Sequence, residues 1–125
     1  MAELDEETLA FAHRMFDLAR SGDPELPAQV AAGLPVNLTN DKGDTLLILA
    51  AYHQHPGIVT ALLQMGADPD RVNDRGQTAL GAAVFRKNQE TVNALLAAGA
   101  DPHAGRPSAV ELAEYFKLPE VSLRT

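Results

Sequence analysis

The second half of this sequence repeats itself at a fixed spacing. Residues 43–51 read GDTLLILAA and align with GQTALGAAV at 76–84, and residues 62–69 read LLQMGADP and align with LLAAGADP at 95–102. The differences 76 − 43 and 99 − 66 both give 33. A constant period of this size, with nothing inserted between the copies, predicts a stacked array in which each unit buries its apolar side against its neighbours.

Each period contains two stretches with helical spacing of apolar residues. The first helix is expected to bury small and branched side chains, and the second a broader apolar stripe with the leucine pairs at its end; the predicted core is Leu47, Ala50, Ala51, Leu80, Ala83 and Val84, then Ile58, Val59, Leu62, Leu63, Val92, Leu95 and Leu96. Gly33, Gly66 and Gly99 follow the second helices, where a left-handed residue ends a helix without strain. The Asn-Asp-x-Gly runs ending at Gly43 and Gly76 predict two projecting β-turn fingers.

The two ends of the chain carry helices that fit the same scheme. An apolar stripe through Leu9 and Phe16 predicts one amphipathic helix from about Asp5 to Arg20. A second helix is expected to begin only near Pro27, because proline is easiest at the first helical position. Ser108 has capping-box spacing to Glu111 and predicts a last helix reaching about Lys117, after a shortened third finger.

A 33-residue unit that opens with Gly-x-Thr and closes with Leu-Leu-x-x-Gly-Ala-Asp resembles the ankyrin repeat. The resemblance implies an all-α solenoid of about four stacked helix-turn-helix repeats with β-turn fingers. We expect a single domain over 1–125, divided into an N-terminal capping repeat (1–42), two repeats (43–75 and 76–106) and a truncated C-terminal capping repeat (107–125). The family's Thr-Pro-Leu-His tetrapeptide reads TLLI at 45–48 and TALG at 78–81. Without its histidines, we expect neighbouring repeats to be coupled more by packing than by polar contacts.

Charge and composition restrict the possible partners. With 17 acidic and 10 basic residues the formal net charge is −7, so a nucleic acid would be repelled. No segment is long and apolar enough for a membrane span, and the acidic first residues are unlike a secretory signal. The absence of cysteine removes disulfides and thiol chemistry and makes a reducing cytoplasm the simplest location.

The sequence offers little for catalysis. The strongest candidate for a metal-dependent or enzymatic site is the pair His53 and His55, which lacks further ligands at suitable spacing. His55 also falls where ankyrin repeats often carry a structural histidine at the turn. We therefore expect no enzyme, no catalytic residue, no metal site and no cofactor, and keep the histidine pair as an alternative.

Partner binding is the better-supported prediction. The resemblance implies that a protein or peptide is held on the concave face, formed by the finger tips and the exposed side of the first helices. Mapped by repeat position, that face carries two aromatic residues surrounded by basic ones, which favours an acidic partner; the predicted contact residues are Arg20, Lys42, Asp44, Tyr52, His53, Arg75, Gln77, Phe85, Arg86 and Lys87. A homo-oligomer is a second possibility, because Leu112, Phe116 and Leu118 are expected to have limited cover at the C-terminal end.

Overall fold

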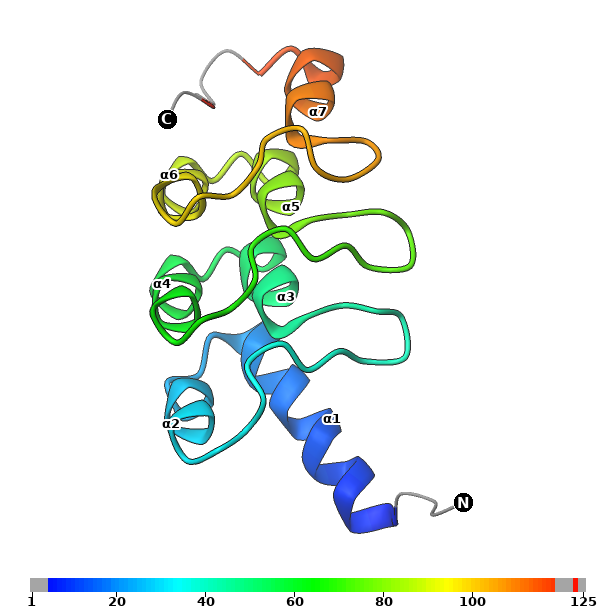
Figure 1. Cartoon of the computed structure of the whole chain (residues 1–125), viewed down its shortest axis with the longest axis vertical. Helices are drawn as coiled ribbons and strands as arrows, with labels where there is room; N and C mark the ends of the chain where they lie inside the picture. The colour runs from blue at the N-terminus through cyan, green and yellow to red at the C-terminus, as the bar shows by residue number, and fades with distance from the viewer. Residues whose placement is uncertain (1–4, 119–122, 124–125) are drawn as a thin grey trace.

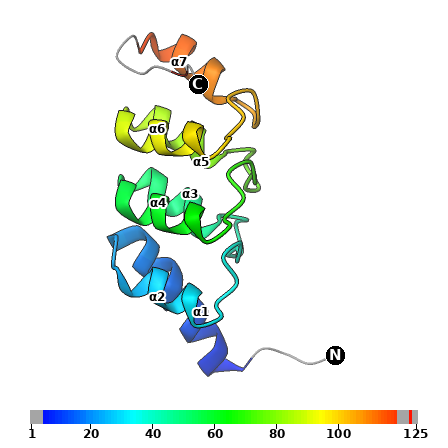
Figure 2. The same cartoon turned by 60° about the vertical axis from the view of Figure 1, so that its left-hand side comes forward.

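The computed structural model describes residues 5–118 and 123, and within this part the chain forms seven helices and no named strand. They are α1 (Glu6–Ser21), α2 (Glu25–Ala31), α3 (Leu46–Tyr52), α4 (Pro56–Gln64), α5 (Ala79–Phe85), α6 (Gln89–Ala97) and α7 (Ala109–Phe116). The first helices α1, α3, α5 and α7 stack in one column and α2, α4 and α6 in a second, while the loops between pairs project away from the first column (Figure 1). Figure 2 shows the same pairs as successive layers. The predicted all-α stack of helix pairs is confirmed.

Hydroxyl side chains fix where the first helices begin. Thr45 Oγ1 accepts from the amide of Ile48 at 3.0 Å, and Thr78 Oγ1 accepts from Gly81 at 3.0 Å. Ser108 does the same for α7, with Glu111 returning the bond to complete the predicted capping box. These bonds satisfy amides that have no partner inside the helix. The register of the first column is therefore set by one capped position in each of three repeats.

The start of α2 differs from the prediction. The helix begins at Glu25, with Pro24 as its N-cap, and not near Pro27. Pro27 is the third helical residue, and the first four amides of a helix have no intrahelical acceptor, so a proline there removes no hydrogen bond. Asp23 secures the start, since its Oδ1 accepts from the Glu25 amide at 2.9 Å.

The core follows the stack and is filled mainly by the first helices. Residues 46–51 and 79–84 are all buried, because these helices lie between two neighbours of their own column and the second helix of their own repeat. In α4 the fully buried leucine is Leu62, while Leu63 is only half-buried, so the prediction that Leu63 belongs to the core was wrong in degree. Leu96, at the corresponding position in α6, is 7% exposed.

Polar contacts between repeats are more extensive than we expected. They come from the loops and not from the tetrapeptide. Backbone amides link successive fingers, with Asp74 N donating to Lys42 O at 3.0 Å and Arg106 N donating to Gly76 O at 2.8 Å. Side chains link the opposite loops, where Asn37 Oδ1 accepts from Asp68 N at 2.9 Å. Adjacent layers are thus joined by directional hydrogen bonds in addition to packing.

Candidate functional site

A hollow of about 480 Å³ lies between the fingers and the first helices. We call it the concave groove. It draws residues from every layer of the stack, and its lining consists of Arg20, Asn40, Asp41, Lys42, Asp44, Ile48, Leu49, Tyr52, His53, Arg75, Gln77, Gly81, Ala82, Phe85, Pro107 and Leu112. Eight of the ten predicted contact residues are in this set; Arg86 and Lys87 are not.

Two aromatic side chains are the exposed large apolar groups of the groove. Tyr52 and Phe85 end α3 and α5, seven residues after the caps Thr45 and Thr78. Because the layers superpose, their rings stack with centroids 6.2 Å apart and planes inclined by 12°. They stay 39% and 47% exposed. Each ring holds the other in place while leaving surface for a ligand.

Arg86 is held against the same aromatic pair. Its guanidinium carbon lies 4.9 Å from the centroid of the Tyr52 ring, a cation–π contact. Arg86 therefore lies beside the groove without lining it, and its predicted contact with a partner stays a prediction. Lys87 is exposed at the next position, a turn residue with a left-handed φ of 59°.

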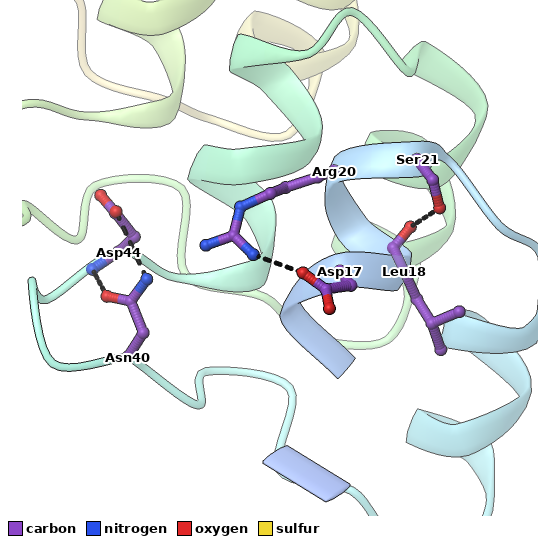
Figure 3. A network of polar contacts seen from close by, with 6 residues as sticks. All are labelled: Asp17, Leu18, Arg20, Ser21, Asn40 and Asp44. Atoms are coloured by element: carbon purple, nitrogen blue, oxygen red, sulfur yellow. Dashed lines mark hydrogen bonds and ion pairs between the residues drawn. The ribbon is translucent and has the colours of Figure 1, made fainter. Parts of the chain in front are cut away.

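Further basic groups stand at the finger side of the groove. Lys42 and Arg75 occupy equivalent exposed positions in the two fingers. Arg20, at the end of α1, forms an ion pair with Asp17 at 2.8 Å, and Figure 3 shows it beside the first finger. Both partners of that pair are exposed, so the pairing is weak and open to exchange. Across residues 5–118 this is the only ion pair, so no other basic group of the groove is ion-paired with a carboxylate in that range.

Asparagine side chains stabilise the fingers by hydrogen bonds to the backbone of the same finger. Asn40 Oδ1 accepts from the amides of Lys42 and Asp44 at 2.9 and 3.0 Å, and the contact with Asp44 is seen in Figure 3. Asn73 repeats this with Arg75 and Gln77, and its Nδ2 also donates to Asp44 Oδ1 at 2.8 Å. Asp44 is only 6% exposed. Its carboxylate therefore joins two fingers, and the prediction that Asp44 contacts a partner stays a prediction for a side chain that is mostly covered.

The histidine pair does not converge on one point. His55 Nε2 donates to the Arg20 carbonyl oxygen at 2.8 Å, which joins the α3–α4 turn to the end of α1. His53 lies in the groove, where burial first, and then the positive charges of Arg20, His55 and Arg86, lower its pKa. Among the residues that the structure describes, no group of three His, Cys, Asp or Glu side chains could hold a metal ion. The two histidines thus have separate places: His55 links two repeats, and His53 lies in the groove.

Comparison with known proteins decides the family. A family model described as ankyrin repeats (3 copies) matches residues 15–105, well over half of the sequence. The chain belongs to the ankyrin repeat family. Ankyrin repeats are in general protein-interaction modules and are typically non-catalytic.

One curated relative is also similar. The Pseudomonas aeruginosa protein PA3287, an ankyrin repeat protein by its name, is 53% identical over 58 residues, which cover 46% of this chain and 34% of the relative. The chain therefore matches about a third of that protein's length. In the part of this ankyrin chain that the structure describes, no helix is long and apolar enough to cross a membrane.

Sequence reasoning did not assign the contribution of α7 to this ankyrin groove. Leu112 lines it, and the Phe116 ring meets Phe85 edge-on with centroids 5.7 Å apart. Tyr115 then contacts Phe116 at 4.9 Å and is 79% exposed. The 33-residue spacing fails here because the third finger is shorter. Counting from the caps gives Tyr115, seven residues after Ser108, which contacts Phe116 and not Phe85.

The expected bare C-terminal end is only partly present. Phe116 is 43% exposed and Leu112 is half-buried, but Leu118 is 6% exposed and part of the core. The amide of Leu118 donates to the Ala113 carbonyl at 3.1 Å, which turns the chain back after α7. The expectation that Leu118 has limited cover was therefore wrong, because it is buried.

Proposed function

We propose that this ankyrin chain is a non-catalytic interaction module that holds a peptide or a folded protein in the concave groove. The observation that carries the proposal is the stacked pair Tyr52 and Phe85, exposed on the wall of a hollow. Large apolar side chains that stay exposed next to a cavity are typical of binding surfaces. Since their stacking already orders the two rings, a ligand would lose little entropy in ordering them.

The charge around the rings supports an acidic partner. Of the ten Lys and Arg residues of the chain, three line the groove, Arg20, Lys42 and Arg75, and a fourth, Arg86, lies against the Tyr52 ring. Two carboxylates, Asp41 and Asp44, line it as well, and Asp44 is engaged with Asn73. The rest of the molecule is acidic, because the whole chain carries −7. A local basic surface on an acidic protein would attract carboxylates and repel basic competitors.

Catalysis at the histidine pair is the less favoured alternative. His55 is engaged with the Arg20 carbonyl, and His53 has no acidic or nucleophilic partner among the described side chains. A rigid, pre-stacked aromatic wall suits recognition better than proton transfer. The groove is accordingly proposed as a docking surface.

A random peptide library displayed on phage tests the proposal, because such a selection does not require the partner to be identified. Peptides are selected on the wild-type chain and re-measured on the double variant Tyr52→Ala, Phe85→Ala. Truncating two hot-spot aromatics should weaken binding by at least about 2 kcal/mol, roughly 30-fold. Circular dichroism must show that the variant keeps its helix content.

A matched control separates the groove from general stickiness. Met65 and Val72 are 39% and 49% exposed, which are nearly the exposed fractions of Tyr52 and Phe85. Neither residue lines the groove. The variant Met65→Ala, Val72→Ala should bind the selected peptides as the wild type does. If the selected peptides bound the two double variants equally well, the groove would not be the binding surface.

A further inference from the structure

The imidazole of His53 is a polar group of the concave groove that the rest of the fold does not use. His53 directly follows Tyr52 at the end of α3, and the two rings meet edge to face with centroids 5.2 Å apart. The side chain is half-buried and lines the hollow. Within residues 5–118 and 123 no group forms a hydrogen bond with either of its ring nitrogens, whereas His55 is bonded to the Arg20 carbonyl. His53 therefore offers both nitrogens to an occupant of the groove.

The charges that act on His53 are positive. They belong to Arg20 at the end of α1, to His55 in the α3–α4 turn and to Arg86 after α5; burial first, and then these three charges, lower the pKa of His53. Lys42 and Arg75 line the finger side of the same hollow. Without a ligand, the imidazole is therefore neutral at pH 7 and lies among cationic side chains.

The carboxylates of this region do not balance that charge at His53. Asp17 is ion-paired with Arg20, and Asp44 is 6% exposed and hydrogen-bonded to Asn73. Asp41 lies on the exposed tip of the first finger. None of these three acids is among the charges that shift the pKa of His53. The finger side of the groove is thus mixed in charge, while the surroundings of His53 attract an anion.

We infer that His53 recognises a carboxylate of the bound partner and takes up a proton when that carboxylate binds. The inference rests on the proposed function, because it names the chemistry that one part of the same groove recognises and makes its affinity depend on pH. A carboxylate at hydrogen-bond distance favours the charged imidazole, which opposes the effects of burial and of the neighbouring cations. The groove therefore holds acidic partners more tightly as the pH falls from 8.0 to 6.0.

The place of His53 also specifies the partner sequence. The Tyr52 ring that His53 contacts is stacked on Phe85, and the Arg86 guanidinium carbon lies 4.9 Å from the centroid of the Tyr52 ring. A partner whose apolar side chain covers the stacked pair has its neighbouring residues close to both bases. The recognised segment is accordingly a bulky apolar residue with Asp or Glu close to it in sequence.

Calorimetric titration of the full chain with a histidine-free peptide from the phage selection tests the inference between pH 8.0 and pH 6.0. This range stays above the pI of about 4.9 and keeps the Asp and Glu side chains of the peptide ionised. One proton changes the dissociation constant by at most tenfold per pH unit, so we expect binding to be about fivefold tighter or more at pH 6.0. Titrations in two buffers of different ionisation enthalpy should show net proton uptake.

Variants of the protein assign this proton to one residue. His53→Gln keeps a polar side chain but cannot take up the proton, so it should lose the tightening at low pH and the proton uptake. His103→Gln, at an exposed histidine outside the groove, is the matched control and should keep both. In NMR titrations of the wild type, the pKa of the His53 imidazole should be higher with the peptide than without it.

Variants of the peptide test the same contact without changing the protein, so they decide the matter even if His53→Gln does not fold. Replacing each Asp or Glu of the peptide by its amide, one at a time, should remove the tightening in one case.

Four results would overturn the inference: equal affinity at pH 8.0 and pH 6.0, equal tightening in wild type and His53→Gln, equal tightening with every amide peptide, or groove-dependent peptides that contain no acidic residue. The proposed function stands in all four cases. It is judged at a single pH, by the loss of binding in the variant Tyr52→Ala, Phe85→Ala.

Discussion

Replacing Asn73 tests how much one side chain contributes to holding two repeats together. Asn73 is 5% exposed and makes four hydrogen bonds: its Oδ1 accepts from the amides of Arg75 and Gln77, and its Nδ2 donates to Asp44 Oδ1 at 2.8 Å and Gln77 Oε1 at 2.9 Å. Asn40 occupies the same position one repeat earlier, with the two backbone bonds but only a 3.5 Å contact from its Nδ2 to Asp44. Asn40 and Asn73 therefore differ mainly in one contact: only Asn73 makes a short hydrogen bond to a residue of the neighbouring finger.

The expected magnitudes follow from these bonds. Asn40→Ala removes two neutral bonds at the edge of the protein and should cost about 1–2 kcal/mol. Asn73→Ala removes the equivalent two bonds, the bond to Gln77 and the 2.8 Å bond to the nearly buried Asp44 carboxylate, which keeps only the long contact from Asn40. Losing the charge-assisted bond adds about 2 kcal/mol. For a chain of this size, about 2 kcal/mol corresponds to a further fall in Tm of roughly 6–10 °C.

Thermal unfolding followed by circular dichroism, together with urea titration, measures both variants under the same conditions. We expect Asn73→Ala to unfold well below Asn40→Ala, with similar m values. Equal losses of stability in the two variants would refute the reasoning, because the contact with Asp44 would then contribute nothing beyond the shape of the finger.

Three further comparisons test other parts of the structure by the same unfolding measurements. Gly22→Ala should lose more stability than Gly66→Ala: both glycines have left-handed φ, which costs about 1–2 kcal/mol for alanine, but only at Gly22 does a histidine ring of the next repeat occupy the space of the new Cβ. Leu62→Ala should cost about 3–5 kcal/mol, and Leu63→Ala clearly less, because only Leu62 is fully buried; equal losses would contradict the core assignment. The lowered pKa of His53 means that the unfolded chain binds its proton at a higher pH than the folded chain, so this group reduces stability as the pH falls below about 6.5. Between pH 7 and pH 5, the Tm of His53→Gln should therefore fall less than the Tm of the wild type. An equal fall in the two proteins would contradict a lowered pKa for His53.

The 33-residue period predicts most of the fold because it determines how the units pack against one another. A unit that cannot bury its apolar side alone must lie against its copies, so the pairs α3/α4 and α5/α6 follow from the alignment. The start of α2 does not follow from proline preference at the first helical position, because a proline later in the first turn also removes no hydrogen bond. The partial exposure of Leu63 could not be predicted, since it depends on how closely successive second helices approach.

The groove could be predicted in part. The shared position after the caps brings Tyr52 and Phe85 together, and their stacking follows from the repeat. The burial of Asp44 depends on Asn73, 29 residues away, and no local pattern indicates that contact. The role of Phe116 is hidden in the sequence because a shortened finger shifts α7 out of the 33-residue register.

Amide chemical-shift mapping of the labelled chain with a selected peptide tests the central claim most directly. The account predicts that the largest shifts fall in the fingers at 40–44 and 75–77, at the ends of α3 and α5, and on α7 near Leu112 and Phe116. Shifts concentrated on α4 and α6 instead, with the residues around Tyr52 and Phe85 unchanged, would contradict it.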